Sequence, residues 1–490
     1  MDNPYPDSCP LIEPGYSRYQ YRHWSVSTPT MDSKMLGMRP ISGEADIFAM
    51  LPLLNRTYPV DVMSSSTSAS GKPAAPDSTP DAANPTATSS EANGFEHWRR
   101  NLAVCVFGSF TTIIAMTVML PFLPLYVQEL GVSDHAAIVQ WSGIAFGATF
   151  LTAGLTAPLW GKLADRYGRK LMLIRASLGM AIVMSLMGMA HSVEQLVVLR
   201  LAAGLLGGYA SGSMVLVATQ TPKARCGWAL GMLSSGIMAG NVAGPLIGGI
   251  IAPVIGIRTT FLVAGALIFL TFLGTVFLIK RDRPVQSGAK DGEPAGWSAV
   301  ADKRPLIAML LTGMLLMFAN MSIEPIITVF VAQLVPAHQV TMMAGLVMSG
   351  AALGSILSAS RLGKLADRIG HWNVLIGCLV AAGLLLVPQA IVTQGWQLIV
   401  LRFAMGLSLG GLMPCVTSVI RHNVPPRVAG HMLGYSISAQ YTGQVLGPVA
   451  GGYVGGHIGM RSVFWATAGI LLAGAFYNGR ARAKVQRSPG

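Results

Sequence analysis

The sequence predicts an all-α membrane protein with twelve transmembrane helices in two pseudo-symmetric six-helix halves. Three observations support this fold class. The 490 residues are 52% hydrophobic and only 11% charged, whereas soluble chains carry about 25% charged residues. Apolar runs of about twenty residues, the length that crosses a bilayer, follow one another from Asn101 onward. Motifs of the first half then recur in the second half.

The twelve apolar runs are expected to form the membrane helices, separated by short polar breaks. In chain order they cover residues 102–127, 137–159, 171–190, 195–217, 226–250, 259–280, 305–333, 342–361, 373–391, 395–418, 429–454 and 461–478. Membrane proteins concentrate Lys and Arg in their short cytoplasmic loops. With the N-terminus inside, only Arg258 and Arg461 fall in outer loops. Both termini are therefore predicted to be cytoplasmic.

Composition also divides the chain into domains. Residues 1–96 are rich in Ser, Pro, Thr and Ala without apolar periodicity, which predicts a disordered cytoplasmic extension. Residues 97–280 and 305–490 are predicted to be the two six-helix bundles, the second with a short basic tail. The polar segment 281–304 is predicted to link them on the cytoplasmic side.

An internal repeat relates the two bundles. GKLADRYGRK, starting at Gly161, answers GKLADRIGHW, starting at Gly363, and Arg200 answers Arg402 at the same spacing. A constant spacing across six helices predicts two homologous halves. In transporters, paired repeats move against each other around a site at their interface. The repeat therefore favours a protein that carries solutes.

Three motifs, in the expected order, resemble those of the major facilitator superfamily and of its twelve-helix drug:proton antiporters. VLRLAAGLLGG (198–208) is similar to the helix 4 signature. The signature between helices 2 and 3 is matched by Gly161, Asp165, Arg166, Gly168, Arg169 and Lys170. The helix 5 antiporter signature is matched by Gly236, Gly240, Gly244 and Pro245. The resemblance implies proton-driven export of drug-like or amphipathic molecules by alternating access in a bacterial inner membrane.

The charged motif has its own physical interpretation. Its two glycines permit a tight turn between helices, and Asp165 can join the neighbouring cations in a charge-assisted network or occupy a helix N-terminus. The resemblance implies a cytoplasmic latch that holds the outward-open form. The alternative is that the cations only set the topology. Topology does not explain Asp165 or the repeated pair Asp367 and Arg368, so we favour the latch.

Arg200 lies inside a predicted span, where an arginine costs about 2.5–3.5 kcal/mol and needs a partner or a wet cavity. The resemblance implies a role in proton coupling. The alternative is a structural arginine that bonds helix carbonyls, and the matching Arg402 gives this alternative weight.

Glu324 is the only carboxylate inside a predicted span, and the repeat aligns it with Leu120. Low polarity favours the protonated form of a carboxyl, so such a group can take up a proton on one side and release it on the other. We predict that Glu324 couples transport to protons. The alternative is that the helix ends earlier and Glu324 only contacts outer water.

The glycines of the fifth span recur every four residues, which leaves one helical face almost without side chains. Neighbouring helices can approach closely along such a face, and Pro245 is expected to bend the helix. The resemblance implies that this face seals the interface between the halves against leak. Ordinary packing is the alternative.

Other classes of function lack their motifs. The chain has no phosphate-binding GxxxxGK[ST], no HExxH and no GxSxG, so we expect no enzyme and no cofactor, with the proton gradient as the energy source. Its five cysteines form no CxxC pair, which argues against a metal site. The net charge of +13 follows from topology rather than from nucleic-acid binding.

The expected partners are drug-like substrates, protons and the bilayer, and we expect a monomer. An adaptable substrate cavity is predicted from polar, aromatic and methionine side chains, although packing or lipid contact is the alternative for each of them: Trp141, Phe146, Phe318, Asn320, Met343 and Tyr441. Two other functions stay open, an uptake symporter on the same fold and a receptor or scaffold that does not transport. The helix 5 glycines argue against the first by resemblance, and Glu324 argues against the second.

Overall fold

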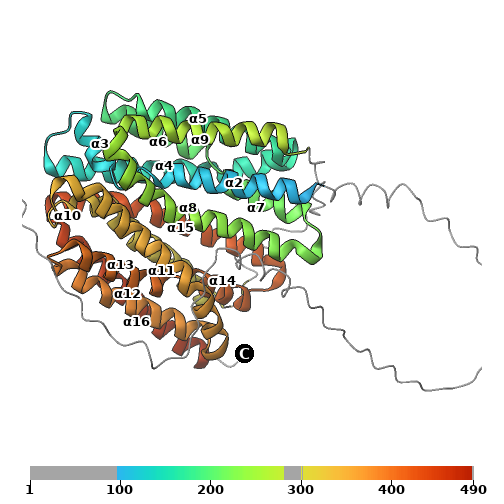
Figure 1. The fold of residues 1–490 in the computed structure, drawn as a ribbon. Helices are drawn as coiled ribbons and strands as arrows, with labels where there is room; N and C mark the ends of the chain where they lie inside the picture. Colours follow the sequence, from blue (N-terminus) through green and yellow to red (C-terminus); the bar gives the residue numbers. More distant parts are fainter. Residues whose placement is uncertain (1–96, 281–299, 301, 488–490) are drawn as a thin grey trace, which may run out of the picture. The chain divides into compact units, whose positions relative to one another are not determined.

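The computed structural model describes residues 97–280, 300 and 302–487, and these residues are helical almost throughout (Figure 1). The predicted disordered extension and most of the predicted linker lie outside the described residues. The helices of the first half are α2 (Trp98–Thr117), α3 (Leu123–Glu129), α4 (His135–Tyr167), α5 (Arg169–Gly188), α6 (Val193–Leu206), α7 (Tyr209–Gln220), α8 (Cys226–Ile255) and α9 (Ile257–Leu278). Those of the second half are α10 (Arg304–Val331), α11 (Val340–Ile369), α12 (His371–Ile391), α13 (Gly395–Leu409), α14 (Leu412–Asn423), α15 (Pro426–His457) and α16 (Met460–Arg487).

The predicted fold class, an all-α membrane protein of twelve spans, is confirmed. Eleven spans in the described part are long and apolar enough to cross a membrane, with α6–α7 and α13–α14 each counting as one. Helix α15 is as long as the others but is less apolar, because Gln440, Gln444 and His431 interrupt its sequence. It supplies the twelfth span.

Three predicted spans are broken rather than continuous. The first divides into α2 and α3 at residues 118–122. The fourth breaks between α6 and α7, where Gly208 has the left-handed φ of 102° that glycine tolerates best. The tenth breaks at Gly410 and Gly411, the matching place in the second half. The apolar runs predicted these spans but not the breaks within them.

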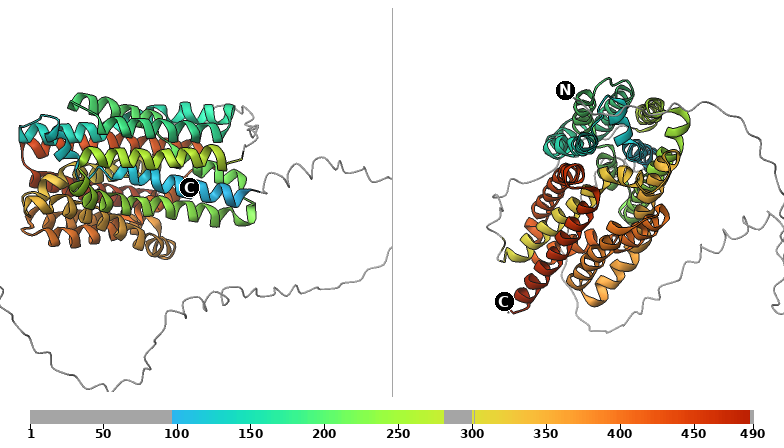
Figure 2. Two further views of the ribbon diagram at one scale, coloured as in Figure 1. Left: turned by 45° about the horizontal axis from the view of Figure 1, so that its top comes forward. Right: turned by 90° about the vertical axis from the view of Figure 1, so that its left-hand side faces the viewer.

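The two halves contact each other through two matching helix pairs, α4 with α15 and α8 with α11 (Figures 1 and 2). A Cβ atom added to Gly143 on α4 would lie 2.2 Å from the carbonyl oxygen of Pro448 on α15. A Cβ atom added to Gly345 on α11 would lie 2.4 Å from the carbonyl oxygen of Pro245 on α8. Gly143 and Gly345, like Pro245 and Pro448, are equivalent positions of the repeat. The same backbone contact is thus made twice, as a pseudo-twofold relation requires.

These contacts occur at one end of the bundle, which we call the contact end. The other end, which we call the loop end, carries the turns at Gly168 and Gly370 between α4 and α5 and between α11 and α12. Six glycines on the loop-end parts of the four interface helices have no atom within 4 Å of an added Cβ: Gly161, Gly227, Gly231, Gly363, Gly430 and Gly434. The halves therefore touch near the contact end and separate towards the loop end.

Within the second half, glycines let α15 pack directly on the backbone of α10. An added Cβ would lie 2.2 Å from the Met314 carbonyl oxygen at Gly443 and 1.9 Å from the Ser322 carbonyl oxygen at Gly451. Real Cβ atoms do not approach this closely, so only glycine fits without moving a helix. This packing fixes the position of the α10 segment that follows Ser322.

We predict that Gly451→Ala lowers the unfolding temperature of the purified protein in detergent, because the new methyl group overpacks α10 at a cost of about 1–3 kcal/mol. Gly469→Ala is the matched control, since an added Cβ there meets no atom within 4 Å. The control should unfold at the wild-type temperature or slightly above it, because alanine favours a helix over glycine by about 1 kcal/mol. Equal unfolding temperatures for the two variants would contradict this packing.

Candidate functional site

Glu324 lies within α10, which continues to Val331. The alternative that the helix ends before Glu324 is therefore wrong. Its side chain is partly buried, and Nδ2 of Asn320, one turn earlier, donates a hydrogen bond to its Oε1 at 3.4 Å. The carboxylate thus stands on a helix inside the bundle with a polar neighbour.

Arg402 is a buried cation whose charge acts on Glu324. It lies on α13, is only 3% exposed and interacts electrostatically with the Glu324 carboxylate, although the two form no direct ion pair. Among the described residues, nothing accepts a hydrogen bond from its buried Nε and Nη2. A buried cation stabilises the ionised form of a nearby carboxyl, whereas apolar surroundings favour the neutral form. The two effects oppose each other at Glu324.

The surroundings of Glu324 join the two halves. Thr328, one turn further along α10, donates a hydrogen bond from Oγ1 to the carbonyl oxygen of Leu120 at 3.4 Å. Leu120, which the repeat aligns with Glu324, lies in the break between α2 and α3 rather than in a continuous helix. Glu324 is therefore one turn from a contact between the halves, and the first half has no equivalent carboxylate.

Arg200 is buried elsewhere, within the first half. It is 1% exposed, and its Nε donates to the carbonyl oxygen of Ala145 on α4 at 3.1 Å. Its Cζ lies 5.8 Å from the centre of the Phe146 ring, and Thr149 donates to its carbonyl oxygen at 3.0 Å. These contacts match the structural alternative, and the structure does not bring Arg200 to Glu324. Its role in proton coupling stays a prediction.

The charged motif forms the end of α4 and the start of α5. Gly168, with φ of 89°, makes the turn, as Gly370 does in the second half with φ of 92°. Asp165 lies in the last turn of α4, which excludes the possibility that it occupies a helix N-terminus. Gly161 lies inside α4, on the face that carries Gly143, rather than in the turn.

The cations of this motif bind their own half. Arg169 lies 3.9 Å from Asp165 and donates to the carbonyl oxygen of Val215 at 2.9 Å. Lys170 donates to the carbonyl oxygen of Val276 at 2.8 Å, and Arg166 lies over the Tyr167 ring at 5.4 Å. In this conformation the motif therefore braces α4 and α5 against α7 and α9.

The second copy of the motif is weaker. Asp367 lies 3.7 Å from His371, which is charged only when protonated, and Arg368 stands in the last turn of α11. Histidine replaces the permanently charged Arg169 of the first copy. The network predicted for Asp367 and Arg368 thus has no permanently charged partner at the position of Arg169.

The helix 5 glycines pack inside the first half, which corrects the expectation that they seal the interface between the halves. Added Cβ atoms at Gly236, Gly240 and Gly244 would all meet α2, the last at 1.9 Å from Thr117 Oγ1. Pro245 instead faces α11, where its carbonyl oxygen contacts Gly345. Helix α8 continues through Pro245 to Ile255.

The predicted cavity residues have different immediate contacts, and a cavity that they share stays a prediction. Asn320 accompanies Glu324, and Phe318 packs against Gly447 of α15. Phe146 is 4% exposed and meets the Phe150 ring edge to face with ring centres 5.4 Å apart, which is a core position. Three further residues have these contacts: Trp141 packs on the core of the first half, Met343 contacts Gly395, and Tyr441 contacts Gly154 between the halves.

Sequence reasoning missed Arg175, which lies inside α5. Its Cζ stands 3.4 Å from the centre of the Trp160 ring, and its Nη2 donates to the carbonyl oxygen of Gly207 at 2.9 Å. Trp160 in turn donates to the carbonyl oxygen of Leu205 at 2.8 Å. Both side chains thus support the end of α6 at its break. The signal was present, because Arg175 falls within the predicted span 171–190.

Known proteins resemble this chain in sequence and in fold. A sequence profile described as Major Facilitator Superfamily matches residues 105–388 and 341–489. The multidrug resistance protein MdtG of Salmonella arizonae and that of Salmonella typhimurium are each 40% identical to it over 384 residues, which cover 78% of this chain and 95% of the relative.

Two solved transporters share the fold at low identity. The nucleoside transporter NupG has a TM-score of 0.62 and 15% identity, covering 78% of this chain and 99% of its own. A bacterial homologue of the human lysosomal transporter Spinster, in an inward-facing and unoccupied conformation, has a TM-score of 0.62 and 17% identity, covering 81% and 99%. The helices, the repeat and these matches lead to one conclusion: the chain belongs to the major facilitator superfamily.

Proposed function

We propose that this protein exports drug-like or amphipathic small molecules across a bacterial inner membrane in exchange for protons. The observation that carries the proposal is the contact between the halves at one end only, with Glu324 one turn from it. The substrate class is supported by the MdtG relatives, which are described as multidrug resistance proteins. The proposal requires no cofactor, and one chain supplies both halves.

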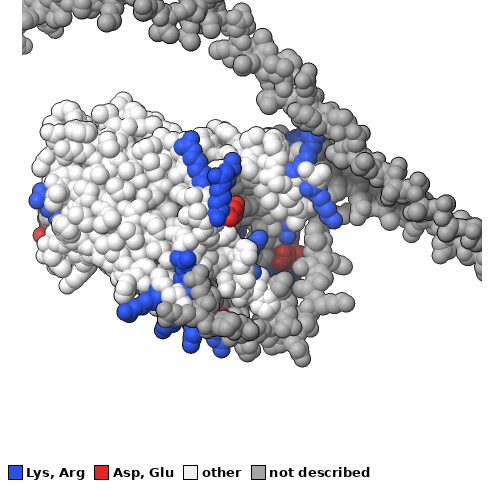
Figure 3. Space-filling model, turned by 90° about the horizontal axis from the view of Figure 1, so that it is seen from below, with Lys and Arg blue, Asp and Glu red and all other residues white. Residues whose placement is uncertain are grey.

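Charge placement orients the bundle in this proposal. Figure 3 shows a broad area free of charged side chains, with Lys and Arg grouped beyond it. The loop end carries the basic motifs that begin at Gly161 and Gly363. Since basic loops remain on the cytoplasmic side, the loop end faces the cytoplasm. The gap between the halves is then open inward, the state in which a drug enters from the cell.

The spacing of small residues supports a second, outward-open state. In antiparallel helices, a step forward along one helix pairs with an equal step back along the other. Gly345 of α11 contacts Pro245 of α8 at the contact end. About five turns away, the same faces carry Gly363 on α11 and Gly227 and Gly231 on α8. The register of the existing contact would therefore place these glycines opposite one another.

The other helix pair repeats this spacing. Gly143 of α4 contacts Pro448 of α15, and about five turns away the same faces carry Gly161 on α4 and Gly430 and Gly434 on α15. Both helix pairs therefore carry small residues at both ends, where backbones could come into close contact. Closing the loop end while opening the contact end would exchange one set of backbone contacts for the other.

Glu324 provides the exchange with protons in this proposal. In the outward-open state it takes up a proton, and in the inward-open state it releases the proton to the cytoplasm, where the drug then binds. Arg402 stabilises the ionised carboxylate between these events. Each proton that moves inward gains about 2.3 kcal/mol per 100 mV of membrane potential. That energy drives the return with bound drug.

We predict that Glu324→Gln reduces drug transport driven by a pH gradient about tenfold or more in inside-out vesicles, because the amide cannot carry the proton. Accumulation of ethidium with and without a protonophore measures this effect. Glu129→Gln is the control, since Glu129 is an exposed carboxylate at the end of α3, and it should transport as the wild type does. Wild-type stimulation by the pH gradient in Glu324→Gln would exclude this residue from the coupling.

We predict that Gly161→Leu and Gly363→Leu each keep the unfolding temperature at or slightly above the wild-type value but lower transport between about fivefold and 150-fold. An added Cβ at either position meets no atom within 4 Å in the inward-open state, yet the new side chains overpack the closed loop end by about 1–3 kcal/mol. Vesicle transport and thermal unfolding in detergent measure the two effects.

Gly469→Leu is the matched control for this pair, because Gly469 on α16 is also free of neighbours and lies away from the four interface helices. It should keep both properties. Undiminished transport by Gly161→Leu and Gly363→Leu would contradict closure of the loop end along this register.

A further inference from the structure

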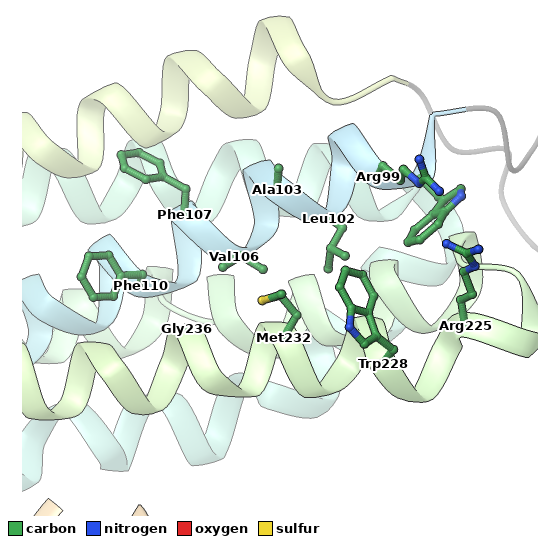
Figure 4. A pocket seen from close by; sticks show the side chains of 11 residues that line it. Arg99, Leu102, Ala103, Val106, Phe107, Phe110, Arg225, Trp228, Met232 and Gly236 are labelled. Atoms are coloured by element: carbon green, nitrogen blue, oxygen red, sulfur yellow. The ribbon is translucent and has the colours of Figure 1, made fainter. Parts of the chain in front are cut away.

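A groove with a volume of about 920 Å³ runs between α2 and α8 at the loop end (Figure 4). Its walls are mainly apolar, with Val106, Phe107 and Phe110 from α2 and Met232 from α8. Gly236 forms part of its floor, because α8 touches α2 directly there. Nothing in the proposed transport cycle uses this groove.

The groove opens on the outer surface of the bundle rather than into the gap between the halves. Met232 and Trp228 lie on a face of α8 that is exposed along its length, since Ile250 further along the same face is 51% exposed and Val254 is 80% exposed. The face of α8 that turns towards the second half is a different one and carries Pro245. The groove therefore faces the hydrocarbon of the membrane.

Two arginines stand at the same end of the groove, as Figure 4 shows for Arg99 and Arg225. Neither forms an ion pair with a carboxylate in the described part of the chain. Arg99 lies over the Trp98 ring at 5.5 Å, and the rings of Trp98 and Trp228 meet edge to face at 6.3 Å. Tryptophan is typical of the level of the lipid headgroups. The groove thus has a cationic end at the membrane surface and an apolar remainder.

The length of the groove matches one leaflet of a bilayer. From Arg99 to Phe110, α2 rises about 16 Å, and half of the hydrocarbon core is about 15 Å thick. Arginine is well suited to phosphate, which its planar guanidinium binds through two hydrogen bonds. The two arginines would repel a cationic drug and attract an anion, so their charge favours an anionic ligand.

We propose that this groove binds an anionic glycerophospholipid of the cytoplasmic leaflet, with its phosphate between Arg99 and Arg225 and an acyl chain along Phe107 and Phe110. The inward orientation used here rests on the proposed function, but lipid binding itself does not depend on transport. Each arginine near an anionic lipid contributes about fivefold in affinity, and the pair about thirtyfold.

Quenching of tryptophan fluorescence tests this site in the full chain purified in detergent. Phosphatidylglycerol with brominated acyl chains is titrated against phosphatidylcholine with the same chains. The difference between wild type and Trp98→Phe/Trp228→Phe isolates the signal of the groove. We expect phosphatidylglycerol to quench this signal at a concentration about thirtyfold lower than phosphatidylcholine. We also expect that inorganic phosphate does not displace the bound phosphatidylglycerol.

The double variant Arg99→Gln/Arg225→Gln should abolish the preference for phosphatidylglycerol. The control Arg421→Gln/Lys484→Gln should retain this preference, because it removes two exposed cations of the loop end that lie outside the groove. Thermal unfolding shows whether the double variant Arg99→Gln/Arg225→Gln keeps its fold. If it does not, the single variants Arg99→Gln and Arg225→Gln are used instead. Each is expected to weaken the preference about fivefold. Equal quenching by both lipids would overturn the proposal. So would a preference that survives without both arginines, or displacement by inorganic phosphate, which would indicate a site for the headgroup alone.

Discussion

Direct contact between helix backbones is the constraint on which the rest of this structure depends. Gly143 and Gly345 meet the carbonyl oxygens of Pro448 and Pro245, so the two halves approach as closely as helices can. Without a hydrophobic driving force between helices in lipid, such close packing supplies much of the association. The contact also limits where the halves can separate, since the glycines at the other end of the same four helices meet no atom of the described residues within 4 Å of an added Cβ.

The sequence predicted the helix number, the repeat and the position of Glu324 inside a helix, because each depends on local composition or on spacing. It did not predict the breaks at Gly208 and at residues 118–122. Hydropathy cannot separate one long helix from two short collinear ones, and only the backbone shows that Gly208 is left-handed. The adjacent glycines Gly207 and Gly208 were nevertheless a visible sign in the sequence that the fourth span could break there.

The partners of single side chains were harder to predict. The spacing of Gly240 and Gly244 shows which face of α8 is bare, but not which helix packs on it, and α2 rather than α11 does so. Arg200 and Arg402 are equivalent in the repeat, yet one bonds a carbonyl of α4 and the other interacts with Glu324. The repeat predicts that the two halves have equivalent helices. It does not predict the contacts of a single side chain, because the neighbouring residues differ between the halves.

The surfaces through which the two halves touch contact main-chain atoms, which affects how the substrate range can evolve. A surface that touches carbonyl oxygens demands glycine on one helix but places little demand on side chains between the glycines. Residues such as Trp141 and Asn320 can then vary without disturbing the motion of the halves. Distant relatives with the same moving parts are free to diverge towards chemically different cargo, so a shared fold at low sequence identity carries little information about what each one transports.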